Sequence, residues 1–137
     1  MIVADANVIL YALTPGERTS SAREALEGAD GVAVPRLWRL EIANALAVMV
    51  RRRLLTRKEA TQAFAGALAT FSSREHEVAL DAALRIALES GLSAYDAEYV
   101  ALARELGCDY SPTTDGSLVA AQDVAQPLVD RSSAAST

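Results

Sequence analysis

The chain has 137 residues, 51% of them hydrophobic, and a formal net charge of −5. This length suits one domain, and this apolar content excludes a disordered chain. The single cysteine, Cys108, excludes an internal disulfide, and no apolar stretch is long enough to cross a bilayer. Because residues 1–5 also lack a basic leader, we expect a cytoplasmic protein with no signal peptide and no membrane contact.

Short apolar runs alternate with helical patterns along the chain. We predict, in order, a strand at 2–4, helices at 8–13 and 20–27, a strand at 32–34, helices at 37–53 and 57–69, a strand at 75–78, helices at 79–89 and 93–106, and strands near 110 and 123–125. This alternation predicts an α/β fold with a parallel sheet between helices. We assign residues 1–130 to one domain and expect 131–137 to be a disordered tail.

Local signals set the boundaries of several helices. Thr56 and the glutamate three residues later match a capping box, while Gly91 and Gly107 are typical of helix ends. In the long helix at 37–53 we predict one main apolar stripe. Its members are Leu40, Ala43, Leu46, Ala47 and Val50.

Four carboxylates stand where a parallel sheet gathers its ligands. Asp5 and Asp115 follow predicted strands, and Glu41 and Asp96 lie near the starts of helices. Each also has an ordinary structural explanation: a helix cap for Asp5 and Asp96, a solvent-facing side chain for Glu41, and a turn for Asp115. If the four converge, they repel one another unless a cation holds them. Oxygen ligands suit Mg²⁺ or Mn²⁺, and one histidine with one cysteine is too few for a zinc site.

The negative net charge argues mildly against a nucleic-acid partner. The positive charge is nevertheless clustered, in one group at 51–58 and in a second formed by Arg36 and Arg39. The first group also fits cations at a helix end, where they favour the helix dipole.

Four segments together resemble the PIN-domain family, and most of all the VapC-type toxins of toxin–antitoxin pairs. They are Asp5-Ala6-Asn7, Glu41-Ile42-Ala43-Asn44, the stretch 95–103, which is the most specific, and 113–118. The resemblance covers nearly the whole chain. It implies a three-layer fold with about five parallel strands, and a Mg²⁺- or Mn²⁺-dependent endoribonuclease that forms a homodimer and is blocked by a cognate antitoxin.

The same resemblance implies a role for each residue of the site. The metal ligands would be Asp5, Glu41, Asp96 and Asp115, with Glu98 substituting or assisting and with Asn7 and Thr113 positioning water. Arg36 and Arg39 precede Glu41 and are candidates for holding RNA phosphates, although Arg39 equally suits an ion pair with an acid.

Two other functions remain open at this point. A non-catalytic module that grips RNA or a protein is compatible with the apolar face at 46–50, which suits a dimer or an antitoxin groove. An aspartyl-phosphate phosphatase or a receiver domain also places an aspartate after its first strand. Such proteins lead us to expect a lysine at the phosphate, and the only lysine here, Lys58, lies in the basic group.

Overall fold

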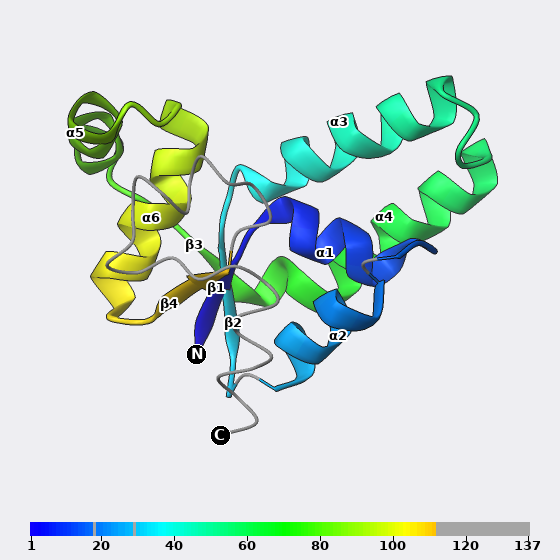
Figure 1. The fold of residues 1–137 in the computed structure, drawn as a ribbon, viewed down its shortest axis with the longest axis horizontal. Helices are drawn as coiled ribbons and strands as arrows, with labels where there is room; N and C mark the ends of the chain where they lie inside the picture. The colour runs from blue at the N-terminus through cyan, green and yellow to red at the C-terminus, as the bar shows by residue number, and fades with distance from the viewer. Residues whose placement is uncertain (18, 29, 112–137) are drawn as a thin grey trace.

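The fold is that of a computed structural model, which describes residues 1–17, 19–28 and 30–111 (Figure 1). Its elements in chain order are β1 (Ile2–Ala4), α1 (Ala6–Leu13), α2 (Thr19–Glu27), β2 (Val32–Pro35), α3 (Trp38–Arg51), α4 (Arg57–Phe71), the short 3-10 helix η1 (Ser72–Arg74), β3 (Glu75–His76), α5 (Leu80–Ser90), α6 (Ala94–Leu106) and β4 (Asp109–Ser111). No helix in these ranges is both long enough and apolar enough to cross a membrane. The predicted strand at 123–125 and the tail at 131–137 lie outside the described residues.

The strands form one parallel sheet in the order β3-β2-β1-β4. Strand β1 pairs with β2 through Ile2 opposite Val32, and with β4 through Ile2 opposite Asp109. All three residues of β1 are buried, as a central strand covered on both faces requires. Because the strands are parallel, their carboxyl ends lie at the same edge of the sheet, where β1 leads into α1 and β2 leads towards α3.

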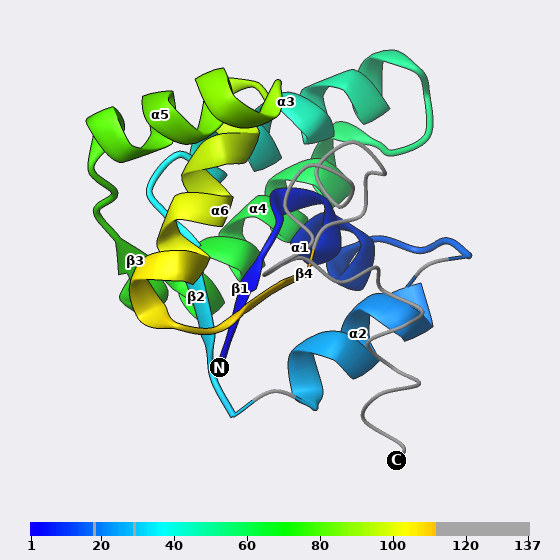
Figure 2. The same cartoon turned by 60° about the vertical axis from the view of Figure 1, so that its left-hand side comes forward.

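Helices cover both faces of this sheet, which gives the three layers expected from the sequence. Helices α5 and α6 lie on one face, and α1, α2 and α4 lie on the other (Figures 1 and 2). Helix α6 packs on β1, β2 and β4, and its residues 99–103 are almost completely buried. Helices α3 and α4 form a hairpin whose turn lies at the periphery of the molecule in both views.

The predicted apolar stripe of α3 was wrong in part, because its member Leu46 is buried but its member Leu40 is not. Leu40 is 74% exposed, whereas the buried residues of the helix are Trp38, Ile42 and Leu46. These three lie on one i, i+4, i+8 ridge, and Trp38 anchors it by an edge-to-face contact with Phe71 of α4 at 5.8 Å between ring centroids. Apolar residues occur on several faces of α3, so the tertiary contact of its tryptophan decides which face is buried.

The predicted helix boundaries agree with the structure wherever a local signal defined them. The capping box at the start of α4 is present in both directions, between Thr56 and Glu59. Gly91 and Gly107 end α5 and α6 with φ values of 78° and 64°, a left-handed conformation that costs glycine little. Strand β3 is shorter than the predicted 75–78, because only Glu75 and His76 pair with β2.

Candidate active site

Asp5 stands at the carboxyl end of the central strand β1 and is 5% exposed. Its side chain is also the N-cap of α1, since its Oδ1 accepts a hydrogen bond from the backbone N–H of Asn7 at 2.8 Å. The structure therefore shows the capping role and the strand-end position in the same residue. The cap fixes the orientation of one carboxylate oxygen and leaves the carboxylate at the edge of the sheet where ligands gather.

Glu41 lies in the first turn of α3 and is half-buried. Its Oε1 accepts a hydrogen bond of 2.6 Å from the hydroxyl of Tyr99, whose side chain is fully buried in α6. This bond joins α3, which follows β2, to α6, which precedes β4, and it leaves Oε2 of Glu41 as the other acceptor of the carboxylate. Asn44, three residues after Glu41 in the same helix, is exposed.

The electrostatics of Glu41 show that several acids share this region. Burial raises the pKa of Glu41 from 4.5 to about 7. The negative charges of Asp5, Asp96 and Glu98 raise it further, and the hydrogen bond from Tyr99 acts in the opposite direction. Glu41 therefore interacts with three other carboxylates, one directly after β1 and two in α6.

The remaining acids of this group come from the start of α6. Asp96 lies in the first turn, where its backbone N–H donates to Oγ of the capping Ser93 at 3.1 Å. A negative side chain is favoured at this end of a helix. Glu98 is half-buried, and burial raises its pKa above the ordinary value. The predicted residues Thr113 and Asp115 lie outside the described part of the chain.

The donors in this group fit a hard divalent cation such as Mg²⁺ or Mn²⁺. They are all carboxylate oxygens, and the pKa of Glu41, which burial raises most, is raised further by the negative charges of three neighbouring acids that a cation would offset. In the described ranges, no three acidic, histidine or cysteine side chains are close enough together to form a ready-made metal cage. The group is therefore a set of converging donors, and Asp115 stands outside the part that the structure describes.

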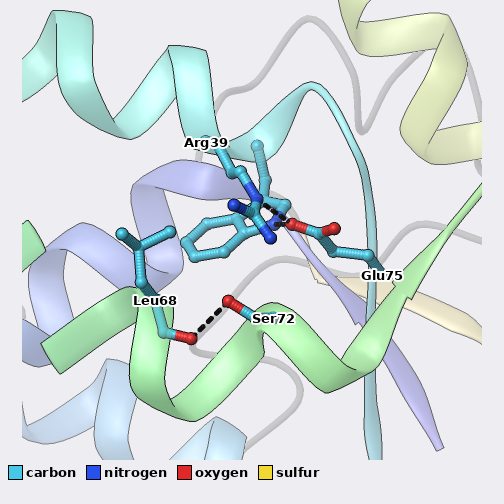
Figure 3. A network of polar contacts seen from close by, with 5 residues as sticks. Arg39, Leu68, Ser72 and Glu75 are labelled. Atoms are coloured by element: carbon cyan, nitrogen blue, oxygen red, sulfur yellow. Dashed lines mark hydrogen bonds and ion pairs between the residues drawn. The ribbon is translucent and has the colours of Figure 1, made fainter. Parts of the chain in front are cut away.

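The two arginines that precede Glu41 have partners in the edge strand β3 or directly after it. Nε of Arg39 donates to Oε1 of Glu75, and the indole N–H of Trp38 donates to the same oxygen at 2.7 Å (Figure 3). Arg36 lies 3.7 Å from Glu77, and both side chains are exposed. The ion pair of Arg39 ties α3 to β3, which favours the structural alternative for this residue over contact with RNA.

Comparison with known proteins gives a consistent result. A family model described as "PIN domain" matches residues 2–124. The chain is 35% identical to Ribonuclease VapC3 of Pyrobaculum aerophilum over 109 residues, which is 77% of this chain and 83% of that protein.

Solved structures show a similar fold at lower sequence identity. PAE2754 from Pyrobaculum aerophilum matches 98% of this chain and 88% of its own, with a TM-score of 0.77 and 20% identity. FitAcB from Neisseria gonorrhoeae matches 94% and 99%, with a TM-score of 0.72 and 20% identity. FitAB bound to the IR36 DNA fragment matches 93% and 95%, with a TM-score of 0.71 and 19% identity.

Proposed function

Since this chain belongs to the PIN-domain family, we propose that it is a VapC-type endoribonuclease that hydrolyses phosphodiester bonds of RNA at its carboxylate group. The observation that carries the proposal is the environment of Glu41. Its carboxylate is held by Tyr99 and lies in the field of Asp5, Asp96 and Glu98. A helix cap or a solvent-facing glutamate requires no such convergence from three separate elements.

The chemistry proposed for the site depends on a divalent cation, Mg²⁺ or Mn²⁺. We assign its ligands to Asp5, Glu41 and Asp96, with Asp115 from beyond the described residues as the fourth and Glu98 as an assisting acid. When bound, the cation supplies positive charge that offsets the repulsion among the carboxylates and stabilises the charge that develops on a phosphate during hydrolysis.

The residues of the chain hold the reacting groups in place. The backbone of α1 fixes Asp5 through its cap, and the hydroxyl of Tyr99 fixes Oε1 of Glu41. The hydroxyl of Tyr99 leaves Oε2 of Glu41 available, so we assign to this atom either ligation of the cation or orientation of the water. Asn7 and Thr113 remain our candidates for positioning the water.

We also propose that the chain forms a homodimer and that a cognate antitoxin protein binds and inhibits it. The similarity to Ribonuclease VapC3 supports a toxin of this kind. The dimer is further supported by an exposed ridge on α5, because Leu80, Leu84 and Leu88 are 73%, 55% and 77% exposed at i, i+4 and i+8. A continuous apolar ridge on a helix surface is typical of a protein contact.

Cleavage of a mixed RNA pool by the purified protein tests the proposed activity. We expect discrete fragments with Mg²⁺ or Mn²⁺, and none with EDTA or with Asp96→Asn. A matched control is Asp81→Asn, which changes an exposed aspartate in the first turn of α5 and should cleave like the parent. If calorimetry shows no metal binding and no RNA is cut, the non-catalytic binding module becomes the better explanation.

A further inference from the structure

The turn between α3 and α4 carries a dense group of positive charge, which we call the basic tip. It consists of Arg51, Arg52, Arg53, Arg57 and Lys58. These five exposed side chains make up more than a third of the 13 basic residues in a chain of net charge −5. Within residues 1–17, 19–28 and 30–111, none of them forms an ion pair. The tip is therefore a concentration of charge that this part of the chain does not neutralise.

Helix electrostatics explains only two of the five cations. Arg51 is in the last turn of α3 and Arg52 is its C-cap, and cations are favoured at that end of a helix. Arg57 and Lys58 are instead the first two residues of α4, where the positive end of the helix dipole disfavours them. The positions three and four residues further along α4 are occupied by Ala60, Thr61 and Gln62, so no acid at these positions pairs with either cation, and the acid of the first turn, Glu59, is engaged in the capping box.

Arg53 also occupies a position that its backbone disfavours. Its φ of 58° is left-handed, and it closes α3 with two hydrogen bonds, from its own N–H to Val50 O at 3.0 Å and from Leu54 N–H to Met49 O at 2.9 Å. This arrangement normally uses glycine, because a side chain is strained in the left-handed region. Three cations therefore stand where the fold alone does not favour them, and an anion outside the chain is the simplest compensation.

We propose that the basic tip holds the phosphate backbone of the substrate RNA at a distance from the cleavage site, an inference that rests on the proposed ribonuclease activity. Guanidinium and ammonium groups are the usual phosphate contacts of nucleic-acid-binding proteins. Helix α3 carries Glu41 in its first turn and Arg51 at its end, so it joins the two regions directly (Figure 1).

The length of α3 sets the reach of the RNA. Glu41 and Arg51 are ten residues apart, which corresponds to about 15 Å along the helix axis. A stacked strand advances by about 3.4 Å per nucleotide, so about four or five nucleotides cover this distance. The tip therefore selects RNAs that extend at least that far from the scissile phosphate.

Equilibrium binding to RNA tests this proposal on an Asp96→Asn background, in which the RNA is not consumed. The tip variant adds Arg57→Gln and Lys58→Gln. The matched control adds Arg74→Gln and Arg85→Gln, which remove two exposed arginines elsewhere and change the net charge equally. Fluorescence anisotropy would follow a labelled single-stranded RNA of about twelve nucleotides, more than twice the four or five nucleotides of reach, over a range of salt concentrations.

We expect the tip variant to lose two phosphate contacts. The slope of the logarithm of the RNA-binding constant against the logarithm of the salt concentration should then fall in magnitude by about 1.4, at about 0.7 per contact. Extrapolated from equal binding at about 1 M, this corresponds to about 25-fold weaker binding at about 0.1 M salt. The control should keep the slope of the Asp96→Asn parent. The midpoint of thermal unfolding should be unchanged or higher in the tip variant, since the dipole of α4 no longer opposes its first residues, and this excludes unfolding as the cause of weaker binding.

An unchanged slope, or an equal loss in the tip variant and the control, would overturn the proposal. If the wild type cleaves RNA in that case, the proposed activity stands and an acidic protein segment becomes the better partner for the tip. RNA binding that depends on the tip, in a wild-type protein that cleaves no RNA, would support the tip and overturn the proposed activity.

Discussion

The substitution Glu41→Gln is expected to stabilise the metal-free protein at alkaline pH. The pKa of Glu41 rises from 4.5 to about 7 on folding, mainly because of burial. Between these values the folded protein keeps a proton that the unfolded chain has released, so the free energy of unfolding falls as the pH rises. Glutamine is neutral at every pH and can still accept the hydrogen bond from Tyr99, so the variant should not show this loss.

The size of the effect follows from the same shift. A rise from 4.5 to about 7 corresponds to about 3 kcal/mol against the charged form. Because Glu41 is only half-buried, solvent screening reduces this figure, and we expect the variant to gain about 1–2 kcal/mol above pH 7. The gain should disappear as the pH falls below 4.5, where Glu41 is protonated in both the folded and the unfolded chain.

Urea denaturation in EDTA at pH 5 and pH 8 measures this difference, with the fluorescence of the single tryptophan, the buried Trp38, as the probe. Glu17→Gln is a control for the loss of an exposed carboxylate. Added Mn²⁺ at pH 8 should reverse the order, because only the parent keeps the full set of ligands. An equal loss of stability in Glu41→Gln at both pH values would refute the reasoning and make this carboxylate a purely structural group.

Substitutions at three further positions separate structural from catalytic roles. Asp5→Asn should keep the cap of α1 and the parent's melting midpoint, whereas Asp5→Ala should lose about 1 kcal/mol of stability. Both variants should abolish RNA cleavage. Retained cleavage in either variant would remove Asp5 from the site. Tyr99→Phe removes a hydrogen bond that lowers the pKa of Glu41, so the pH at which Mn²⁺ binding is half-maximal should rise. An unchanged midpoint would show that this bond does not set the pH dependence of metal binding. Glu75→Ala leaves the indole N–H of Trp38 without this acceptor and should cost about 1–3 kcal/mol while cleavage persists; lost cleavage with unchanged stability would indicate a role in RNA binding.

Local sequence signals predicted much of the fold because their partners are adjacent in the chain. Thr56 and Glu59 are three residues apart, and Gly91 and Gly107 end helices through their own backbone conformations. The buried face of α3 was not predictable in this way. It depends on the contact between Trp38 and Phe71, which lie on different helices.

The site shows the same division between local and distant information. The positions of Asp5 and Asp96 at the starts of helices follow from the sequence, but the hydrogen bond from Tyr99 to Glu41 spans 58 residues. One signal for it was present. Tyr99 lies three residues after Asp96 on the inward face of its helix, and a buried tyrosine hydroxyl requires a partner. The sequence could not name that partner, because only the sheet topology brings α3 and α6 together.

The basic tip is the clearest case in which the structure changes the meaning of a sequence pattern. A run of cations at 51–58 is favourable or unfavourable according to the helix end on which each one lies, and from the sequence a favourable helix end was one of two explanations open for the whole group. The boundaries at Arg51 and Arg57 divide it, because α4 begins where its dipole opposes the charge.

This division makes a further prediction about salt. In the RNA-free protein, Arg57→Gln with Lys58→Gln should raise the melting midpoint at about 0.01 M salt, and the gain should shrink towards about 1 M, since the screening length falls from about 30 Å to about 3 Å. Glutamine has nearly the helix propensity of arginine and lysine, so propensity contributes little to the difference. A gain that does not depend on salt would show that electrostatic repulsion is not its source. RNA binding by the parent should weaken over the same range, so that salt acts in opposite directions on the stability and the affinity that the same two cations control.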